Sequence, residues 1–249
     1  MSASSRVAVI TGGAGAFGSA ISARLADDGF RVVLADADAE RAATAAAKIP
    51  GATSWKMDVT SAESVHTAMA GIGEELGRID VVVNNAGVAP PGGMTTTALD
   101  AFDRTLSINL RGSYLVTSAA MPWLQASEAA RVVMIGSRTW LSGGNPAYTA
   151  SKAGIVGLCR SVAQELGPFG GTCNVVAPGP VDTAFVDGMG MGTDRAANFE
   201  RYIEQTPLRR TASPDDVARA AAFFAGDGAS FITGEVLHVA GGLQLAPKL

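Results

Sequence analysis

The sequence contains few residues that could bind a metal ion or form a disulfide bond. Its two histidines, His66 and His238, lie outside any HExxH arrangement, so a catalytic zinc site lacks ligands and we expect no metal. Its two cysteines, Cys159 and Cys173, stand in apolar surroundings without CxxC spacing. This pattern is typical of buried, reduced thiols in a cytosolic protein.

Long apolar runs and basic clusters are also missing. No apolar run approaches the roughly 18 to 20 residues of a membrane span, and the polar opening at residues 1–5 lacks the apolar core of a secretory signal. The formal net charge is -4, and the longest basic block is the Arg209-Arg210 pair. We therefore expect a cytoplasmic protein that binds neither nucleic acid nor a membrane.

Apolar sequence is plentiful, since 47% of the 249 residues are hydrophobic, which is enough for one large core. Short β-branched or apolar runs have the continuous apolarity of strands that are covered on both faces. These runs lie at 7–10, 32–34, 81–83, 132–135 and 174–176. Alanine-rich stretches of helical length lie between them, at 39–48, 62–76, 99–124 and 150–166.

This alternation predicts a single α/β domain over residues 1–249, with a doubly wound parallel sheet of about seven strands and helices on both faces. Ligands of such a sheet bind in the crevice at the carboxyl ends of its strands. A closed eight-stranded barrel is the alternative. The longest stretch without clear periodicity, residues 184–207, predicts a substrate lid, with a plain surface loop as the alternative.

A glycine-rich turn follows the first predicted strand. The residues Thr11-Gly12-Gly13-Ala14-Gly15-Ala16-Phe17-Gly18 lead into a helix, and the glycines allow backbone N–H groups to approach a pyrophosphate closely. Asp36 ends the second strand, about twenty residues later, where a carboxylate can accept hydrogen bonds from ribose hydroxyls. This carboxylate would repel a 2′-phosphate, and no arginine or lysine directly follows it, so NAD is favoured over NADP. Capping of the helix that begins near Asp38 is the alternative role for Asp36.

With these two features the chain resembles the short-chain dehydrogenase/reductase family. The turn is similar to the family's TGxxxGxG motif, with Ala16 in place of the middle glycine, and Asn84-Asn85-Ala86-Gly87 matches its NNAG motif. Asp58-Val59 matches the position that contacts adenine, and residues 178–183 resemble the PGxxxT turn. The resemblance runs from about Arg6 to Leu245 and implies a Rossmann-type fold.

A tyrosine and a lysine stand four residues apart in Tyr148-Thr149-Ala150-Ser151-Lys152, which places them on one face of a helix. A free tyrosine has a pKa of about 10 and is a poor base near neutrality. A cation roughly 4 Å away, at an effective dielectric near 20, contributes about 4 kcal/mol, or up to about three pKa units before desolvation opposes it. We therefore expect Lys152 to lower the pKa of Tyr148 and make it a usable acid or base.

The family resemblance assigns a role to each of four residues. It implies that Tyr148 exchanges the substrate proton and that Lys152 holds the nicotinamide ribose. Ser137 would hydrogen-bond the reacting oxygen, with Thr139 as a less favoured stand-in, and Asn109 would anchor a water on the proton path. The implied NAD contacts are Gly12, Gly15, Phe17, Gly18, Asp36, Asp58, Val59, Asn85, Ala86, Gly87, Tyr148, Lys152, Pro178, Gly179, Val181 and Thr183.

The chain departs from the family pattern at three points. Only ten residues separate Ser137 from Tyr148, fewer than in many relatives, so we expect an altered substrate wall. Ala16 adds a methyl group to the glycine turn, where it would crowd the cofactor. Ala240 stands where relatives usually carry aspartate.

The sequence thus predicts an NAD-dependent oxidoreductase that interconverts a secondary alcohol and a ketone. One alternative is a 3-oxoacyl-[acyl-carrier-protein] reductase, for which Arg138, Arg195 and Arg201 would offer basic surface to an acidic carrier. The alternative that is not an enzyme is an NAD-binding sensor or scaffold. The intact set of four implied catalytic residues argues against a pure binder.

Substrate and assembly are less defined by the sequence. Apolar side chains on loops predict an apolar substrate pocket, with ordinary packing as the alternative. They are Met94, Trp140, Leu141, Phe185, Met189 and Met191. Small residues after Tyr148 would allow close helix packing between subunits, and the family resemblance implies a homotetramer.

Overall fold

The computed structural model describes residues 5–189 and 194–245. Within them, seven strands form one sheet in the order β3-β2-β1-β4-β5-β6-β7, and each neighbouring pair is parallel. The strands are β1 (Val7–Thr11), β2 (Arg31–Asp36), β3 (Thr53–Lys56), β4 (Val81–Asn84), β5 (Arg131–Ile135), β6 (Thr172–Pro178) and β7 (Val236–Val239). The predicted doubly wound parallel sheet is confirmed, and a closed barrel is excluded because β3 and β7 are edges.

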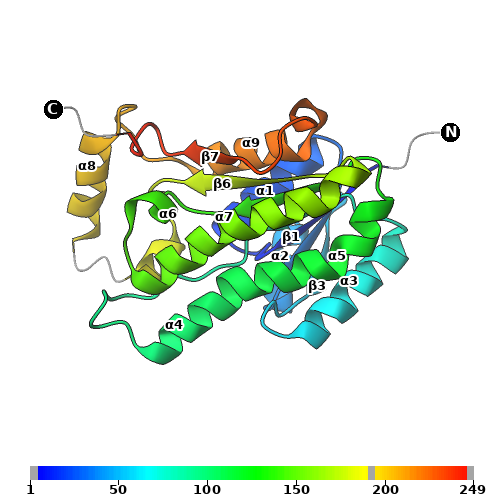
Figure 1. Ribbon diagram of the computed structural model, residues 1–249, viewed down its shortest axis with the longest axis horizontal. Helices are drawn as coiled ribbons and strands as arrows, with labels where there is room; N and C mark the ends of the chain where they lie inside the picture. The colour runs from blue at the N-terminus through cyan, green and yellow to red at the C-terminus, as the bar shows by residue number, and fades with distance from the viewer. Residues whose placement is uncertain (1–4, 190–193, 246–249) are drawn as a thin grey trace.

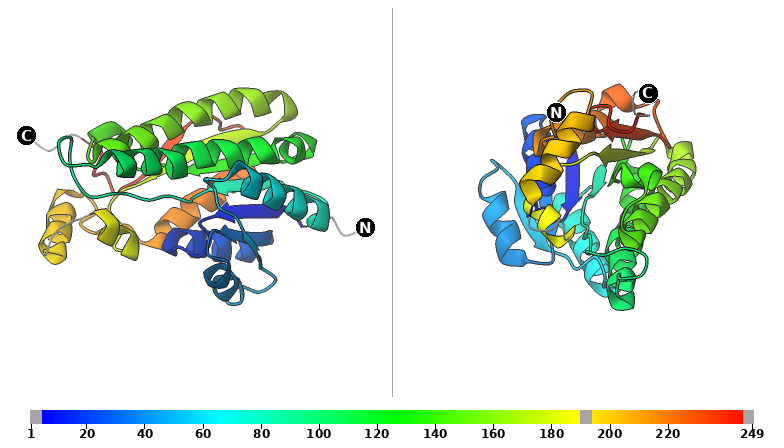
Figure 2. Two further views of the ribbon diagram at one scale, coloured as in Figure 1. Left: turned by 90° about the horizontal axis from the view of Figure 1, so that it is seen from below. Right: turned by 90° about the vertical axis from the view of Figure 1, so that its left-hand side faces the viewer.

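Helices cover both faces of the sheet. In Figure 1, α3, α5 and α7 lie in front of the strands, while α1 and α9 lie behind them. Seen from below in Figure 2, the green helices and the blue helices are separated by the sheet. The α-helices are α1 (Ala16–Asp27), α2 (Ala39–Ala46), α3 (Ala62–Leu76), α4 (Leu99–Leu106), α5 (Gly112–Ala126), α6 (Thr139–Ser142), α7 (Pro146–Leu166), α8 (Arg195–Gln205) and α9 (Pro214–Ala225).

The alternation of side chains along each strand creates two apolar cores. Val7 and Val9 of β1 point toward the core with α3, α5 and α7, whereas Ala8 and Ile10 point toward the core with α1 and α9. All of β1, β4 and β5 is buried. The predicted buried thiols are confirmed, since Cys159 and Cys173 are free and lie in the first of these cores.

Two predicted segments differ in the structure. Residues 99–124 do not form one uniform helix, because a π-helical turn, η1 (Ser107–Arg111), separates α4 from α5. Residues 184–207 are not irregular throughout: they contain a short 3₁₀ turn, η3 (Ala184–Met189), and helix α8. Gly190 and Gly192 lie outside the described residues. No helix in the described part of the chain is long and apolar enough to cross a membrane.

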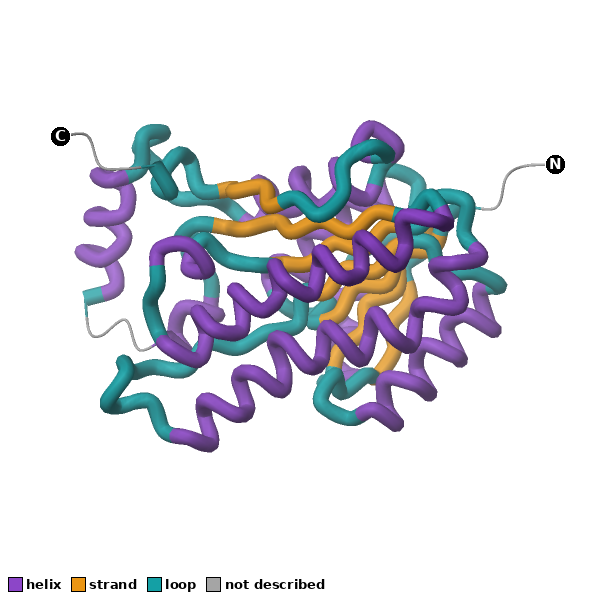
Figure 3. The backbone as a smooth tube through the Cα atoms, viewed as in Figure 1, coloured by secondary structure: helices purple, strands orange, loops and turns teal. Residues whose placement is uncertain are grey.

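The loops at the carboxyl ends of the strands differ from those at the amino ends. The strands run toward the left in Figure 1, and α6, α8 and the loop that enters α4 gather at that end, as the teal segments in Figure 3 also show. The chain crosses from one half of the sheet to the other on its way from β3 to β4, so the strand order reverses between the neighbours β1 and β4. In an open α/β sheet, the crevice beyond this point is where ligands bind.

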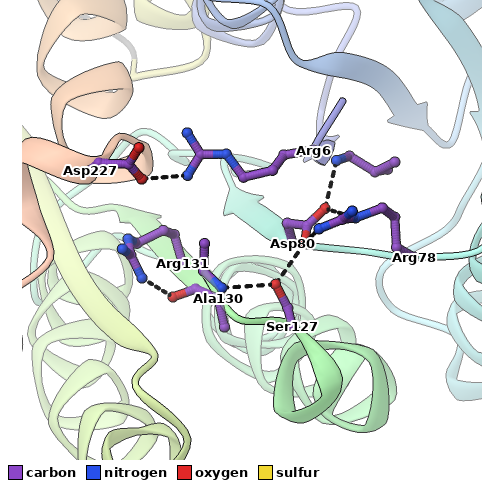
Figure 4. A network of polar contacts seen from close by, with 9 residues as sticks. Arg6, Arg78, Asp80, Ser127, Ala130, Arg131 and Asp227 are labelled. Atoms are coloured by element: carbon purple, nitrogen blue, oxygen red, sulfur yellow. Dashed lines mark hydrogen bonds and ion pairs between the residues drawn. The ribbon is translucent and has the colours of Figure 1, made fainter. Parts of the chain in front are cut away.

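A polar network lies at the opposite end, where the strands begin (Figure 4). The Asp80 carboxylate is buried and accepts hydrogen bonds from Arg78, from the Ser127 hydroxyl at 2.6 Å and from the Val7 N–H at 2.8 Å. Burial alone would raise the pKa of Asp80, but these hydrogen bonds hold it below its usual value. The network joins the starts of β1, β4 and β5 far from the crevice.

Candidate active site

The glycine turn after β1 is compact because its neighbours leave no room for side chains. A Cβ on Gly18 would lie 2.2 Å from the Gly12 carbonyl oxygen, and one on Gly13 would lie 2.7 Å from the Leu34 Cβ. Gly12 has a φ of 62°, and a Cβ there would lie 2.9 Å from the Ala86 Cα. Gly15 is less crowded, with 3.3 Å to the nearest atom.

The N-terminus of α1 lacks a side-chain cap. Its N-cap is Gly15, whereas Asp38 and Ser61 cap α2 and α3 through side-chain hydrogen bonds. The first N–H groups of α1 therefore face the crevice edge without a capping side chain, which suits a phosphate group. Ala16 is the exposed first residue of α1, and Phe17 after it is half-buried.

Asp36 stands beside this turn at the end of β2. Its carboxylate accepts one hydrogen bond from the Ala14 N–H at 3.1 Å and another from the Asp38 N–H at 3.1 Å. Asp38, and not Asp36, caps α2, so the alternative capping role for Asp36 is wrong. Sequence reasoning missed that Arg41 and Lys48 line a groove with Ala14, between α1 and α2.

The residues after β3 and β4 complete this side of the crevice. The Asn85 amide donates to the carbonyl oxygens of Thr11 at 2.9 Å and Gly12 at 3.0 Å, which ties the NNAG loop to the glycine turn. Asp58 is exposed, and hydrogen bonds from Thr60 hold the pKa of its carboxyl below the usual value. Val59 is buried. A Cβ on Gly87 would lie 3.3 Å from the Asn109 Oδ1.

These observations fit a dinucleotide. A sterically required glycine cradle, an uncapped helix N-terminus and a carboxylate at the end of the next strand lie at the crevice, in the arrangement that holds a pyrophosphate and a ribose.

The predicted catalytic side chains meet at the carboxyl end of β5. Tyr148 and Lys152 lie on α7, and Ser137 follows β5 after one glycine. The exposed fractions are 7% for Tyr148, 4% for Lys152 and 8% for Ser137. The Lys152 ammonium lies 5.6 Å from the centre of the Tyr148 ring and donates a hydrogen bond of 2.7 Å to the Ile135 carbonyl oxygen.

Burial controls the protonation of this cluster. It raises the pKa of Tyr148 to about 12, although a hydrogen bond with the Ser137 hydroxyl lowers it. Burial also lowers the pKa of Lys152 to about 8. The predicted lowering of the Tyr148 pKa is therefore wrong for the cofactor-free protein. The physical reason is that the ammonium bonds a backbone carbonyl, and desolvation opposes the phenolate more strongly than the cation favours it.

Asn109 lies in the π-helical turn η1 and is 1% exposed. Its amide accepts from the Val88 N–H at 2.8 Å and donates to the Val88 carbonyl at 2.9 Å and to the Ser151 hydroxyl at 3.0 Å. Its backbone carbonyl accepts from the Ser113 hydroxyl at 2.9 Å. The side chain thus connects the loop after β4 to α7, and a water on the proton path remains a prediction.

The segment after β6 also reaches the crevice. Pro178 ends β6, and a Cβ on Gly179 would lie 3.0 Å from Ala240, which accounts for a small residue at each position. Val181 is buried, and the Thr183 carbonyl accepts a hydrogen bond of 3.0 Å from Arg195.

Two aromatic residues near the crevice have different neighbours. The Phe185 ring lies 6.0 Å from the Tyr148 ring, so this predicted pocket residue does stand beside the predicted acid. Trp140 instead stacks on His238 and donates a hydrogen bond of 3.1 Å to its Nε2. Met94 and Leu141 are exposed, Met189 is half-buried, and Met191 lies outside the described residues.

Sequence reasoning missed one polar residue at this site, Asn145, and the ion pairs of another, Arg195. Asn145 caps α7 and bonds the backbone N–H of Tyr148. The Asn145-Pro146 pair carried the signal, because asparagine is favoured at the N-cap and proline directly after it. Arg195 forms ion pairs with Asp182 and Asp187, which no local sequence pattern predicted. Among residues 5–189 and 194–245, no group of three or more His, Cys, Asp or Glu residues could hold a metal ion.

Comparison with known proteins agrees with this geometry. A family model described as Enoyl-(Acyl carrier protein) reductase matches residues 12–244. The (2S)-[(R)-hydroxy(phenyl)methyl]succinyl-CoA dehydrogenase subunit BbsD of Thauera aromatica is 34% identical over 253 residues, covering 98% of this chain and 99% of the relative. The 3-oxoacyl-[acyl-carrier-protein] reductase FabG of Aquifex aeolicus is 34% identical over 245 residues, covering 96% and 97% of the two chains.

Solved structures share the whole fold as well. The 3-ketoacyl-(acyl-carrier-protein) reductase from Brucella melitensis, complexed with NADH, has a TM-score of 0.89 at 28% sequence identity and covers 96% of this chain and 98% of that chain. These similarities span nearly the full length of every protein compared. The chain is therefore an oxidoreductase that belongs to the short-chain dehydrogenase/reductase family.

Proposed function

We propose that this enzyme transfers a hydride reversibly between NAD(H), in preference to NADP(H), and a small secondary alcohol or ketone, with Tyr148 as the acid and base. The buried cluster of Ser137, Tyr148 and Lys152 at the carboxyl end of β5 carries this proposal. A pure NAD-binding sensor has no need for a phenol and an ammonium that are both desolvated beside a serine.

The cofactor would be held by the residues that the resemblance implies. The glycine turn and α1 N-terminus would bind the pyrophosphate, Asp36 the adenosine ribose, and Asp58 with Val59 the adenine. The NNAG loop and the segment from Pro178 to Thr183 would contact the nicotinamide half. Because the Asp36 carboxylate already points at the turn, it supports NAD over NADP. When bound, the cofactor supplies the hydride acceptor or donor.

The remaining chemistry belongs to the protein. In the reductive direction, the Tyr148 hydroxyl donates its proton to the substrate oxygen while Ser137 hydrogen-bonds that oxygen. Lys152 places a positive charge beside the phenol and favours the phenolate that results. In the oxidative direction, the same phenolate accepts the hydroxyl proton. Phe185, beside Tyr148, supports an apolar substrate.

The second candidate is a 3-oxoacyl-[acyl-carrier-protein] reductase, the activity that the Aquifex aeolicus and Brucella melitensis relatives are named for. It would need free basic surface to bind an acidic carrier. Arg195 is instead paired with two aspartates, and the Arg138 guanidinium stands over the Tyr202 ring at 6.0 Å. The ion pairs of Arg195 favour a small-molecule substrate, whereas Arg138 and Arg201, which hydrogen-bonds Asn198, keep their charge.

Assembly and location remain predictions. A groove on α4, η1, α5 and α7 supports the predicted homotetramer, because its apolar residues offer a surface for close helix packing. It is lined by Leu106, Leu110, Tyr114 and Leu158 together with Asp103, Ser107 and Arg111. The substrate lid, the cytoplasmic location and the exclusion of nucleic acid likewise stay predictions.

Replacing Tyr148 with phenylalanine tests the proposed function. We expect Tyr148→Phe to bind NADH with unchanged affinity, measured by nucleotide fluorescence, while turnover falls by about two or more orders of magnitude because the proton donor is lost. Tyr114→Phe is the matched control, since Tyr114 is 55% exposed on α5. Turnover would be measured as nicotinamide absorbance against a panel of ketones and secondary alcohols. Equal turnover in the two variants would rule out Tyr148 as the acid.

A further inference from the structure

Asn145 holds the first turn of the helix that carries the proposed acid. Its side-chain carbonyl accepts a hydrogen bond of 3.0 Å from the backbone N–H of Tyr148 itself. Its backbone carbonyl accepts a hydrogen bond of 2.8 Å from the Thr149 N–H. With Pro146 as the first residue of α7, this cap fixes where the helix begins and hence where the Tyr148 side chain emerges.

The same side chain also binds a neighbouring loop. Its amide nitrogen lies within hydrogen-bond distance of three acceptors in the loop between β4 and α4: the Gly92 carbonyl at 3.0 Å, the Thr97 hydroxyl at 3.2 Å and the Pro91 carbonyl at 3.3 Å. An amide has two hydrogens to donate, so these acceptors share them. One residue therefore links α7 to the loop that follows the NNAG motif.

This loop is tied to α7 at a second point. Asn109 binds both backbone groups of Val88 and donates to the Ser151 hydroxyl. The Ser151 hydroxyl in turn donates to the Tyr148 carbonyl at 2.7 Å. The loop, residues 85–98, is thus held at Val88 near its start and at Gly92 and Thr97 further along, and both ties meet α7 within one helical turn of Tyr148.

We propose that Asn145 is a positioning residue that holds the Tyr148 hydroxyl at a set distance from residues 91–97, a loop that we take to line the substrate site. The cap bond holds the backbone of Tyr148 in position and thereby affects proton transfer. The bonds of the amide nitrogen hold residues 91–97 in position and thereby affect substrate binding. The inference rests on the proposed function, because it takes Tyr148 to be the acid. A displacement of about 1 Å in a reacting group is enough to reduce a rate by about 10²-fold.

Two substitutions separate the two sets of bonds. Asn145→Asp keeps an oxygen acceptor for the Tyr148 N–H but loses the amide donors, and its charge faces the Pro91 and Gly92 carbonyl oxygens. Asn145→Ala loses both sets. Ser61→Ala is the matched cap control, since Ser61 caps α3 through the Ser64 N–H at 3.2 Å and lies after the edge strand β3, away from α7. Its N–H bonds the Asp58 carbonyl, so NADH affinity is measured for this variant as well.

We expect Ser61→Ala to lower Tm by about 2 to 4 °C and to leave kcat and the substrate KM unchanged. Asn145→Ala should show a similar loss of Tm together with a kcat reduced by about tenfold or more, and NADH affinity within about twofold of the wild type. Asn145→Asp should keep kcat within about threefold, because the cap remains, and raise the substrate KM by about fivefold, because the loop is released.

The measurements are steady-state kinetics, NADH titration and thermal unfolding on all variants and on Tyr148→Phe. If Asn145→Ala matches Ser61→Ala in kcat while Tyr148→Phe is inactive, Asn145 is only a helix cap and the inference is overturned. An unchanged KM in Asn145→Asp overturns the role of the loop bonds. A Tyr148→Phe variant with full turnover overturns the proposed function instead.

Discussion

Replacing Asp36 with asparagine tests how the enzyme chooses between NADH and NADPH. Asparagine keeps the size of the side chain and one acceptor oxygen, so the bond to the Ala14 or the Asp38 N–H can persist. The substitution removes the negative charge that a 2′-phosphate would meet. Arg41 and Lys48, which line the groove beside Ala14, would then offer positive charge to that phosphate.

The magnitude follows from the half-buried position of Asp36. Two unit charges about 4 Å apart interact by about 1 kcal/mol in bulk water and by about 4 kcal/mol at the effective dielectric near a protein surface. A half-buried carboxylate lies between these limits, at about 2 to 3 kcal/mol. Since about 1.4 kcal/mol is tenfold, Asp36→Asn should raise the ratio of kcat/KM for NADPH to kcat/KM for NADH by about 30- to 150-fold.

The assay compares initial rates with the two reduced nucleotides at low and moderate salt. Asp38→Asn changes the net charge equally, two residues away at the cap of α2, and should leave the ratio within about threefold. Adding Arg41→Ala to Asp36→Asn should lower the ratio again by a smaller factor, because it removes a positive charge from the groove beside Ala14. The reasoning fails if Asp36→Asn and Asp38→Asn shift the ratio equally, or if the wild type already prefers NADPH.

Two further predictions concern charge elsewhere in the molecule. Asp80→Asn should lower the free energy of unfolding by about 2 to 3 kcal/mol in denaturant titrations, because it leaves Arg78 without its buried carboxylate, whereas the exposed Asp27→Asn should change it by less than about 0.5 kcal/mol. Since the pKa of Asp80 is depressed in the folded state, the contribution of its carboxylate to the free energy of unfolding is complete above about pH 4 and is lost as the pH falls through the folded pKa. If the wild type and Asp80→Asn still differed by the full amount at about pH 2, this prediction would be contradicted. For Lys152, with a pKa lowered to about 8 by burial, kcat/KM in the reductive direction should fall as the pH rises through about 8. Lys152→Arg stays charged, so its kcat/KM should be lower overall but should no longer decrease as the pH rises through about 8. A wild-type kcat/KM that does not change with pH would refute the role of the ammonium.

The fold was predictable where strands are buried on both faces. β1, β4 and β5 are continuous apolar runs, and the structure places them in the middle of the sheet. The edge strands β3 and β7 gave no such signal, because neither has a buried residue. The turn η1 was invisible, since a π-helical turn changes the hydrogen bonds of a helix without changing its composition.

Helix α8 was missed although its sequence carried a usable pattern. Phe199, Tyr202 and Ile203 follow helical spacing, and Asp194 is a good N-cap residue. The nearby glycines at 188, 190 and 192 outweighed this pattern in the interpretation of residues 184–207 as irregular. The ion pairs of Arg195 with Asp182 and Asp187 depend on where α8 packs, which only the tertiary structure defines.

The spacing of Tyr148 and Lys152 was read correctly from the sequence, but their protonation was not, because burial is a tertiary property. Removing water disfavours the charged form of both groups, which raises the pKa of an acid and lowers that of a base. At neutral pH the phenol is therefore protonated and ready to donate, while the ammonium, with a pKa lowered to about 8, keeps its charge and donates a hydrogen bond to the Ile135 carbonyl. Any ligand that gives Lys152 further acceptors stabilises the ammonium, and the ammonium then favours the Tyr148 phenolate. We therefore expect the pKa of Tyr148 to fall when a ligand in the cleft gives Lys152 further acceptors.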